Sequence, residues 1–468
     1  MTIQTKNILS RRNAIKLIPL SIMTATSLNA NWGEAPKKSV TRKKFLIVGG
    51  GSSAIIILST LLKSIKDPDI TIIAPNEIHL YQPGQLYVAT GIFDNDEITK
   101  DNADFIPKSV NWIKEKVETF LPDENAVVTN TAKKVSYDYL IVATGTQYRY
   151  EYIKGLSQND IGTNNLASVY INDTDKGTAE GGPLTWKWLN EIKEASKERK
   201  QTVLFVKASG LLKCGATAQK IMYMSADYLK KHGFSANYIY STTSSRLFGS
   251  KIVSGSLEKA QSEYDTIKNL YKHNIIAIDV KNKIATYEHK YQIKEGWDPD
   301  FQEWESIEDK RDIIKVKYDF LHLVPPMSAP DALVNSTLCK KEGMFKDWLD
   351  VDEETLQHTQ YENIFGIGDV CGTPLGKTIP SAQHQAKIVL KNLQSLINKK
   401  ELKAKFDGHS VCPIKVGFGE VVMAEFNYSG LNPSFQWLDA SKPSWLWWVY
   451  DVYGAKPLYW YGILPARV

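Results

Sequence analysis

The sequence predicts an α/β protein built on two parallel sheets, and three observations support this. Near residue 50 a short apolar strand runs directly into a glycine turn and then an apolar helix. Two further buried strands, at residues 137–145 and 361–369, end in small-residue turns far apart in the chain. From residue 202 the strand-and-helix order begins again. Strands that alternate with helices form a parallel sheet with helices on its faces, as in Rossmann-like dinucleotide-binding domains.

Length and charge limit the classes of function. The 468 residues suffice for two or three domains with a large core, and the composition, 43% hydrophobic and 23% charged, is that of an ordinary folded protein. A net charge of +5, partly in the first sixteen residues, is too weak and dispersed to predict nucleic-acid binding. It is compatible with an anionic membrane surface.

The first strand and its turn have the form of a phosphate-binding motif. Residues 43–48 are the strand, and residues 55–65 are an apolar stretch of helix length. Glycine permits the tight turn and lets a pyrophosphate approach the backbone, while a small residue lets the helix pack on the strand. The helix N-terminus then offers free N–H groups to the phosphates. The dinucleotide-binding residues expected here are Gly49, Gly50, Gly51, Ser53 and Ala54.

The second strand, Asp69–Ile73, departs from the usual motif. An acidic residue is expected at its end, where it would bind the ribose hydroxyls. Ala74 occupies that position, and Glu77 follows three residues later. The residue that contacts the ribose is therefore left open by the sequence.

Two later strands indicate that the dinucleotide is FAD. Residues 137–145 form a buried strand that ends in Thr144 and Gly145, and residues 361–369 form another that ends in Gly368 and Asp369. An aspartate in this place binds the ribityl or phosphate groups of the flavin in flavoproteins with two dinucleotide-binding domains. The order of the three motifs predicts a FAD-binding domain split between residues 44–150 and 321–400.

The middle domain, residues 151–320, lacks a second glycine motif. The strand at 202–206 is followed by residues 207–214, which contain a single glycine, Gly210, so a second pyrophosphate could not approach closely. NADH is therefore disfavoured as an electron donor, and with it a type II NADH dehydrogenase. The turn instead delivers Cys214 close to a helix predicted at 216–231, and a helix N-terminus favours a thiolate.

The four cysteines are distributed as one redox pair and two others. None belongs to a Cys-x-x-Cys motif, so no metal site is expected. Cys214 and Cys371, which comes just after Asp369, are predicted to converge on the flavin as the redox-active pair. Cys339 is interpreted as incidental and Cys412 as structural.

The two ends of the chain carry targeting and membrane signals. Residues 1–30 combine Arg11-Arg12, an apolar stretch and a small-residue run, the form of a twin-arginine signal peptide. This predicts export to the periplasm and a peripheral position on the outer face of the inner membrane. Residues 401–468 end in an aromatic tail at 444–464, interrupted by Asp451, Lys456 and Pro457. We expect it to form two short segments lying at the membrane interface rather than a spanning helix.

Five family-specific segments resemble the sulfide:quinone oxidoreductases, in particular those of the mitochondrial type. The resemblance covers about nine-tenths of the chain, from Lys44 onward. The matching segments are Leu80–Gly84, Lys213–Tyr223, Val324–Asp331, Asp350–Asp352 with Thr355–His358, and Phe365–Asp369 with Lys377-Thr378. The fold implied is that of the FAD-dependent disulfide reductases, with a membrane-interfacial segment at the C-terminus.

The resemblance implies a reaction and roles for several residues. Sulfide would attack a disulfide between Cys214 and Cys371, leaving a persulfide on Cys371 and a thiolate on Cys214 beside the flavin. Electrons would pass through FAD to a membrane quinone, and a sulfur acceptor would remove the persulfide. The family contacts FAD at the positions of Gln82, Val117, Lys377 and Thr378. Val370 separates Asp369 from Cys371 here, whereas mitochondrial relatives have the cysteine directly after the aspartate.

The same comparison leaves several points open. Relatives with a covalent flavin use a cysteine ahead of the Ala-Thr-Gly turn, and this chain has none before Cys214, so non-covalent FAD is expected. Aromatic residues near Phe418 and the tail are candidate walls of a quinone slot. The alternatives are a flavocytochrome c sulfide dehydrogenase subunit, which would not need an aromatic membrane segment, and a flavoprotein that binds a partner without turnover. A homo-oligomer is compatible with the sequence.

Overall fold

The computed structural model describes residues 39–171, 180–264, 266–298, 302–434, 439 and 442–468. Its first sheet contains five parallel strands contributed by distant parts of the chain. In spatial order these are β22 (Ile364–Gly366), β11 (Tyr139–Val142), β2 (Lys44–Val48), β4 (Asp69–Ile73) and β7 (Asn111–Ile113). Because the strands are parallel, the turns that follow β22, β11 and β2 meet at one edge of the sheet.

Alternate side chains of β2 face two different cores. Phe45 and Ile47 belong to the same buried cluster as the apolar residues of α2 (Ser52–Ser64). Leu46 and Val48 pack instead with an antiparallel sheet on the other side. That sheet consists of β8 (Val117–Leu121), β9 (Ala126–Thr129) and β10 (Lys134–Ser136). The period of two thus buries both faces, as a parallel sheet requires.

The second sheet is also parallel and carries the cysteine-bearing turn. Its strands, in spatial order, are β13 (Leu166–Ala167), β20 (Phe320–Val324), β14 (Thr202–Lys207), β15 (Asn237–Ser241) and β16 (Ile267–Leu270). Its helices are α4 (Gly181–Ala195), α5 (Thr217–Lys231) and α6 (Lys251–Gln261). Since β20 belongs here, this sheet extends past the boundary predicted at residue 320.

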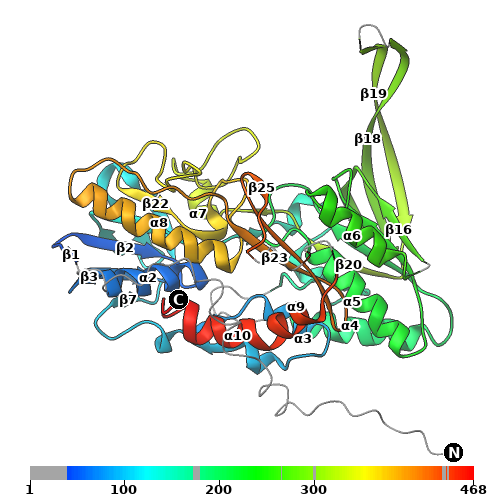
Figure 1. Cartoon of the computed structure of the whole chain (residues 1–468), viewed down its shortest axis with the longest axis horizontal. Helices are drawn as coiled ribbons and strands as arrows, with labels where there is room; N and C mark the ends of the chain where they lie inside the picture. Colours follow the sequence, from blue (N-terminus) through cyan, green and yellow to red (C-terminus); the bar gives the residue numbers. More distant parts are fainter. Residues whose placement is uncertain (1–38, 172–179, 265, 299–301, 435–438, 440–441) are drawn as a thin grey trace, which may run out of the picture.

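A long β-hairpin projects from the second domain, and the sequence analysis did not predict it. It joins β18 (Ile284–Asp298) to β19 (Glu303–Lys317), and β17 (His273–Asp279) pairs with the base of β18 only. The outer part therefore stands out as a two-stranded ribbon (Figure 1).

The C-terminal region crosses back between the two domains. It begins with an antiparallel sheet of β23 (Ser410–Gly417), β24 (Glu420–Asn427) and β25 (Gly430–Leu431), and β23 packs on α5. A helical run follows, made of α9 (Trp445–Val449), the π-helical turn η9 (Tyr450–Gly454), α10 (Ala455–Leu458) and the π-helical turn η10 (Tyr459–Ile463). In Figure 1 this run is drawn in red beside α3 (Gly84–Val88), and the Tyr87 hydroxyl of α3 donates to Asp451 of η9.

The prediction of two short C-terminal segments was wrong, because the helical run is continuous. Pro457 lacks an N–H donor, and the π-helical turn η9 comes just before it, where the hydrogen-bonding pattern changes without ending the helix. Among the described residues, no helix combines the length and apolar character needed to span a bilayer.

The remaining elements are short connections and edge pieces. The short strands are β1 (Ser39–Val40), β3 (Ile65–Lys66), β5 (Ile78–Leu80), β6 (Thr99–Asp101), β12 (Gln147–Tyr148) and β21 (Met327–Ser328). Two short helices lie in connections, α3 (Gly84–Val88) after β5 and α7 (Asp331–Val334) after β21, and the long helix α8 (Ile379–Ile397) packs on α2.

Candidate active site

Three glycine turns meet at the edge of the first sheet. Gly49 has a φ of +125°, and a Cβ built on it would lie 2.3 Å from the carbonyl oxygen of Ala143. Gly368 has a φ of +80°, and its Cβ would lie 2.0 Å from Oγ of Ser53. Only glycine fits such backbone conformations and approaches. The structure therefore brings together the turns that the sequence had predicted for FAD.

The residues around these turns suit the phosphates and hydroxyls of a dinucleotide. A Cβ on Gly51 or on Gly145 would meet no protein atom within 4 Å. The side-chain hydroxyls of Thr144 and Thr146 are buried and have no partner among the described residues. Helix α2 has no side-chain cap at its N-terminus. Buried polar atoms without a partner are costly, so bound phosphates and hydroxyls would satisfy them.

Asn76, rather than Glu77, lies against the glycine turn. Its Oδ1 would be 2.4 Å from a Cβ on Gly50, and its Nδ2 lies 3.3 Å from the Gly50 carbonyl oxygen. Glu77 forms an exposed ion pair with Lys114 at 2.8 Å. The sequence had singled out Glu77 because it is acidic, but the local backbone turns it toward Lys114.

The family-derived FAD contacts lie in two different places. Gln82 accepts a hydrogen bond from Nζ of Lys213 at 2.7 Å, and the same ammonium donates to the Tyr148 hydroxyl at 2.8 Å. Gln82 is therefore connected to the residue that precedes Cys214. Val117 is buried at the start of β8, in the core on the far side of β2.

Lys377 is a buried cation beside Asp369. Its Nζ donates to the carbonyl oxygens of Asp369 and Cys371 and lies 4.0 Å from the ring centroid of Trp348. Burial lowers the pKa of Lys377 to about 8, although Asp369 opposes the shift. Thr378 caps α8, with its Oγ1 accepting from the backbone N–H of Ser381 at 3.3 Å.

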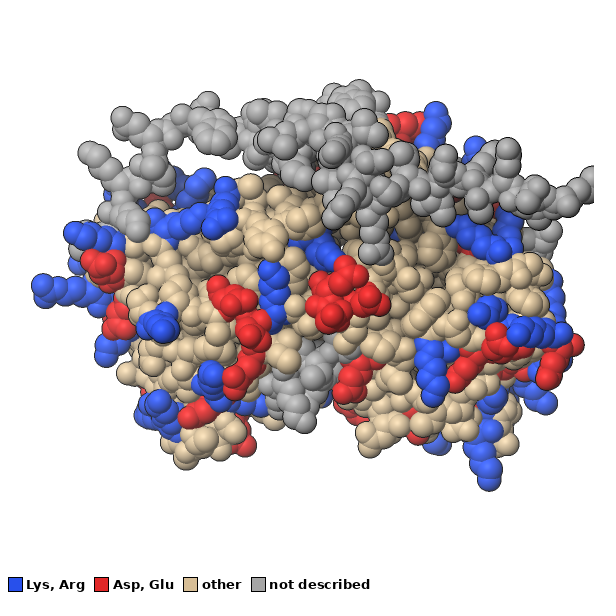
Figure 2. All heavy atoms as spheres, turned by 90° about the horizontal axis from the view of Figure 1, so that it is seen from below, with Lys and Arg blue, Asp and Glu red and all other residues tan. Residues whose placement is uncertain are grey.

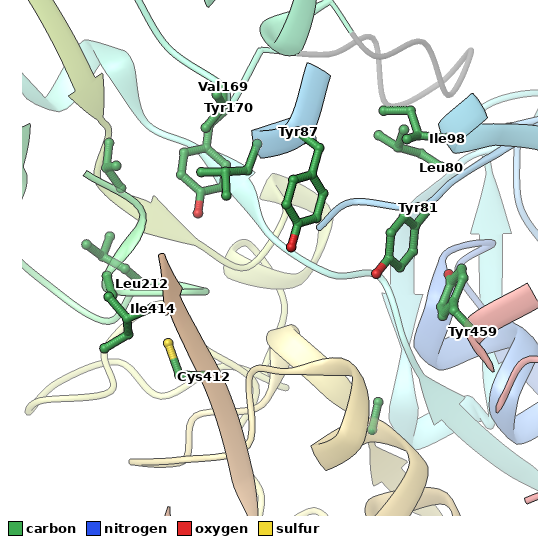
Figure 3. Packing of buried hydrophobic residues seen from close by; sticks show 14 of the residues in the cluster. Leu80, Tyr81, Tyr87, Ile98, Val169, Tyr170, Leu212, Cys412, Ile414 and Tyr459 are labelled. Atoms are coloured by element: carbon green, nitrogen blue, oxygen red, sulfur yellow. The ribbon is translucent and has the colours of Figure 1, made fainter. Parts of the chain in front are cut away.

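The structure brings Cys412, and not Cys371, to Cys214. Cys412 in β23 lies close enough to Cys214 for a side-chain hydrogen bond between them to shift both pKa values, and both are free thiols. Nζ of Lys220, on the first turns of α5, donates to Sγ of Cys214 at 3.1 Å. The crossing of β23 over α5 creates this contact. Figure 3 shows Cys412 on that strand, close to Leu212 and Ile414.

Cys371 does not lie beside Cys214, where the sequence had predicted it. It is fully buried in the second core with Leu349 and Val351, and its sulfur would lie 2.9 Å from a Cβ on Gly366. Its side chain thus faces the body of the first domain and not the β23–α5 junction. Val370, the residue inserted after Asp369, is part of the same core.

The two paired thiols differ in their pKa values. The hydrogen bond from Cys412 lowers the pKa of Cys214 well below its usual range, burial opposes the shift, and the Lys220 charge adds to it. Cys412, as the donor, has a pKa raised well above its usual range. Cys214 also has a φ of +48°, a strained conformation for a residue with a Cβ, as is common at functional sites. These shifts favour ionisation of Cys214 over that of Cys412.

Comparison with known proteins identifies the family. A model of the pyridine nucleotide-disulphide oxidoreductases matches residues 43–179. The mitochondrial sulfide:quinone oxidoreductase of Dictyostelium discoideum is 32% identical over 456 residues, which are 96% of this chain and 92% of that protein. The chain belongs to the sulfide:quinone oxidoreductase family. The mitochondrial enzyme of Mus musculus is 33% identical over 365 residues, or 77% of this chain and 73% of that protein.

Solved structures agree on the fold. The sulfide:quinone oxidoreductase of the hyperthermophilic bacterium Aquifex aeolicus has a TM-score of 0.66 at 20% identity, covering 89% of this chain and 91% of that one. NDH2 of Plasmodium falciparum, solved with NADH, has a TM-score of 0.56 at 15% identity, covering 90% and 99%. Membership of the sulfide:quinone oxidoreductase family confirms the predicted fold class and implies a flavin cofactor.

Sequence reasoning missed two residues of this site. Cys412 was interpreted as structural, and Lys220 was noticed only as part of a matching segment. The strand pattern of residues 410–417 indicates that Cys412 is buried, but it gives no sign of which helix the strand covers. Lys220 follows Cys214 by six residues. Its side chain contacts the Cys214 thiol because the first turns of α5 place it on the side that faces this thiol.

Proposed function

We propose that this chain oxidises hydrogen sulfide with Cys214 and Cys412 and passes the electrons through bound, non-covalent FAD to a membrane quinone. The observation that carries the proposal is the pairing of the two thiols at the start of α5, with a lysine on one sulfur. Family membership supports the sulfide and quinone chemistry, because the curated relatives are named for it.

The unequal pKa values of the two thiols decide which sulfur is attacked. In the oxidised protein the pair forms a disulfide, and hydrosulfide attacks Sγ of Cys412. The Cys412–Cys214 bond breaks as the new S–S bond forms, and Cys214 leaves with the bonding electron pair. The thiol of lower pKa is the better leaving group, and the Lys220 ammonium stabilises the thiolate that departs.

The cycle closes with the quinone as the terminal oxidant. A nucleophilic acceptor takes the outer sulfur of the Cys412 persulfide and frees a second thiolate. The two thiolates then re-form the disulfide and release two electrons. FAD, held at the turns of Gly49, Gly145 and Gly368, would supply the electron acceptor between the thiols and the quinone. Per turnover, one sulfide loses two electrons and one quinone gains them, together with two protons.

An anaerobic sulfide titration of the purified holoenzyme tests the pair. Sulfide should bleach the visible band of oxidised FAD in the wild type, and the variants Cys214→Ser and Cys412→Ser should stay unbleached. Cys371→Ser is the matched control, since it removes the thiol that the sequence had favoured, and it should bleach normally. Full reduction in Cys412→Ser together with loss in Cys371→Ser would restore the pairing that the sequence suggested.

The C-terminal run supplies a surface for the membrane. Trp445 and Tyr461 are more than 60% exposed, and Leu446 and Tyr453 about half exposed, whereas Trp448, Tyr459 and Trp460 are buried in the core. Figure 2 looks onto the lower face of the molecule and shows broad uncharged areas between scattered charges. Tryptophan and tyrosine prefer the headgroup level of a bilayer. We place the membrane contact on this run.

Phe418 continues the same surface at the C-terminal end of α5. Its ring lies 6.0 Å from that of Trp448, centroid to centroid, and its backbone N–H donates to Asp227 at 2.7 Å. We keep Phe418 as a candidate wall of the quinone slot. Replacing Trp445, Leu446 and Tyr461 together by serine should abolish co-sedimentation with anionic vesicles while sulfide still bleaches the flavin. A normal rate with cytochrome c and none with a soluble quinone would favour a cytochrome partner instead.

A periplasmic location is proposed from the N-terminus alone. The predicted twin-arginine signal lies outside the described residues, and the relatives in the comparison carry mitochondrial names. A fusion of residues 1–40 to a reporter should be exported, and replacing Arg11 and Arg12 by lysine should stop it. Export that ignores these arginines would remove the twin-arginine proposal.

A further inference from the structure

A buried ion pair joins the C-terminal run to the cysteine strand. Lys415 follows Cys412 by three residues in β23, and its Nζ lies 2.5 Å from Oδ2 of Asp451 in η9. Both side chains are less than 7% exposed. The hydroxyl of Tyr87 donates to the same carboxylate oxygen at 2.5 Å, and Nζ of Lys415 lies 5.1 Å from the Tyr87 ring centroid.

Buried ion pairs of this kind are expensive to maintain. Removing two charges from water carries a large desolvation cost, and apolar replacements of a buried pair are often equally stable. A stabilising role is thus a weak explanation for Lys415 and Asp451. Their position beside the thiols offers a functional one, because a charge in a poorly solvated site acts strongly on its neighbours.

Several titratable groups face this site from seven elements or turns. They are Lys207 of β14, Lys220 of α5, Cys214 ahead of α5, Cys412 and Lys415 of β23, Asp451 of η9, Tyr87 of α3 and Tyr170 after β13. The hydroxyls of Tyr87 and Tyr170 point to the side of β23 in Figure 3. Lys415 interacts electrostatically with both Lys220 and Cys214, and Asp451 with Lys220.

From this arrangement we infer that Lys415 and Asp451 are positioning residues that set the charge felt by the Cys214–Cys412 pair. The Lys415 ammonium favours a thiolate on Cys214, and the Asp451 carboxylate limits that effect. The C-terminal helical run is thereby a part of the sulfur site as well as the proposed membrane surface. The inference rests on the proposed function of the two thiols.

The two charges predict shifts of opposite sign. In Lys415→Met the carboxylate is left facing the thiols, so the thiolate of Cys214 is disfavoured. In Asp451→Asn the ammonium is left without its counter-charge, so the thiolate is favoured. A charge within about 4–6 Å of a thiol shifts its pKa by about 1 unit or more. Loss of packing would instead move both variants in the same direction.

Peptide-resolved alkylation of the reduced holoenzyme measures these shifts in the pKa of Cys214. The rate at which iodoacetamide labels Cys214 is followed against pH, and its midpoint should rise in Lys415→Met, fall in Asp451→Asn, and return close to the wild-type value in the double variant. The double variant also guards against misfolding, since it leaves no unpaired buried charge. The flavin absorbance of each variant reports whether the holoenzyme is intact.

Lys456→Met is the matched control. Lys456 pairs with Glu97 at 2.7 Å and anchors the same helical run away from the thiols. Its variant should keep the wild-type midpoint. Unchanged midpoints in both single variants, shifts of the same sign, or an equal shift in Lys456→Met would overturn the inference. Because alkylation needs no sulfide, these outcomes are independent of whether sulfide bleaches the flavin.

Discussion

The phenol oxygen of Tyr459 lies 2.6 Å from Oγ of Ser52, at the first residue of the helix that follows the glycine turn. Nε2 of His79 lies 2.6 Å from the same phenol oxygen, and Nδ1 of His79 bonds Asn102, which donates to the Gly50 carbonyl oxygen at 3.1 Å. The C-terminal run is thus hydrogen-bonded to the predicted FAD turn as well as to the cysteine strand. One segment connects both halves of the site.

The variant Tyr459→Phe should weaken FAD retention without unfolding the protein. The ring still fills its place in the core, but Ser52 and His79 each lose a partner. A net hydrogen bond is worth about 1 kcal/mol, so FAD affinity should fall about fivefold to tenfold. Equilibrium dialysis against free FAD measures the change. Tyr453→Phe alters an exposed tyrosine of the same run and should bind FAD as the wild type does.

Two neighbouring glycines should respond differently to alanine. Gly51 has a φ of −85° and open space at its Cβ, so Gly51→Ala should fold normally but exclude FAD, because the methyl group would occupy the space proposed for the pyrophosphate. A Cβ on Gly50 would lie 2.7 Å from Cβ of Ala74, so Gly50→Ala should lower the melting temperature itself. Thermal unfolding and flavin content, measured together, separate the two effects. Normal flavin content in Gly51→Ala would contradict the assignment of that space.

Acid should loosen the connection through His79. Burial lowers the pKa of His79 to about 4 from 6.5, so between these values the unfolded chain binds more protons than the folded one. The free energy of unfolding should therefore fall as the pH drops from 6.5 toward 4, by roughly 3 kcal/mol from this residue at most. His322 and His384 have similarly lowered pKa values, so the test compares denaturant unfolding of the wild type and His79→Gln. A parallel pH dependence in the two proteins would exclude His79 as the cause.

The thiols should differ in their reactivity near neutral pH. Cys214 has a lowered pKa and is partly exposed, whereas burial raises the pKa of both Cys339 and Cys371 to about 12. Iodoacetamide attacks the thiolate, so Cys214 should be labelled first in the reduced protein and the other two only on unfolding. Mass spectrometry of the labelled peptides gives the order. Early labelling of Cys371 would show that it is reachable and ionised after all.

The sequence predicted the local motifs well because their signals are local. The second strand was predicted at Asp69–Ile73 and occupies those residues, and the helix after Cys214 begins at Thr217, one residue from its predicted start. The order of apolar residues and glycines along a short stretch determines such elements, whatever surrounds them. The projecting hairpin was missed, because its outer strands are mostly charged and their few apolar residues, such as Ile293 and Ile307, are exposed and belong to no core.

Identifying the second cysteine of the pair depended on contacts between distant segments of the chain. Cys371 lies next to Asp369 in the chain, and nearness in sequence made it the natural partner for a thiol at the flavin. Its side chain nevertheless points into the first core, while Cys412 arrives from a strand almost two hundred residues after Cys214. Nothing in the sequence indicated that Lys415 and Asp451 form a pair, since one comes from a strand and the other from a π-helical turn.

The sequence by itself determined the α/β class, the three turns that fit a flavin dinucleotide, the missing second glycine motif and the reactive position of Cys214 at a helix start. Each of these follows from residues within one strand, turn and helix, where the backbone geometry is fixed by nearest neighbours. Only the tertiary structure decided that Cys412 and Lys220 share the thiol site and that the C-terminal run closes it. Those contacts depend on how β23 crosses α5, and that crossing is set by the packing of whole domains.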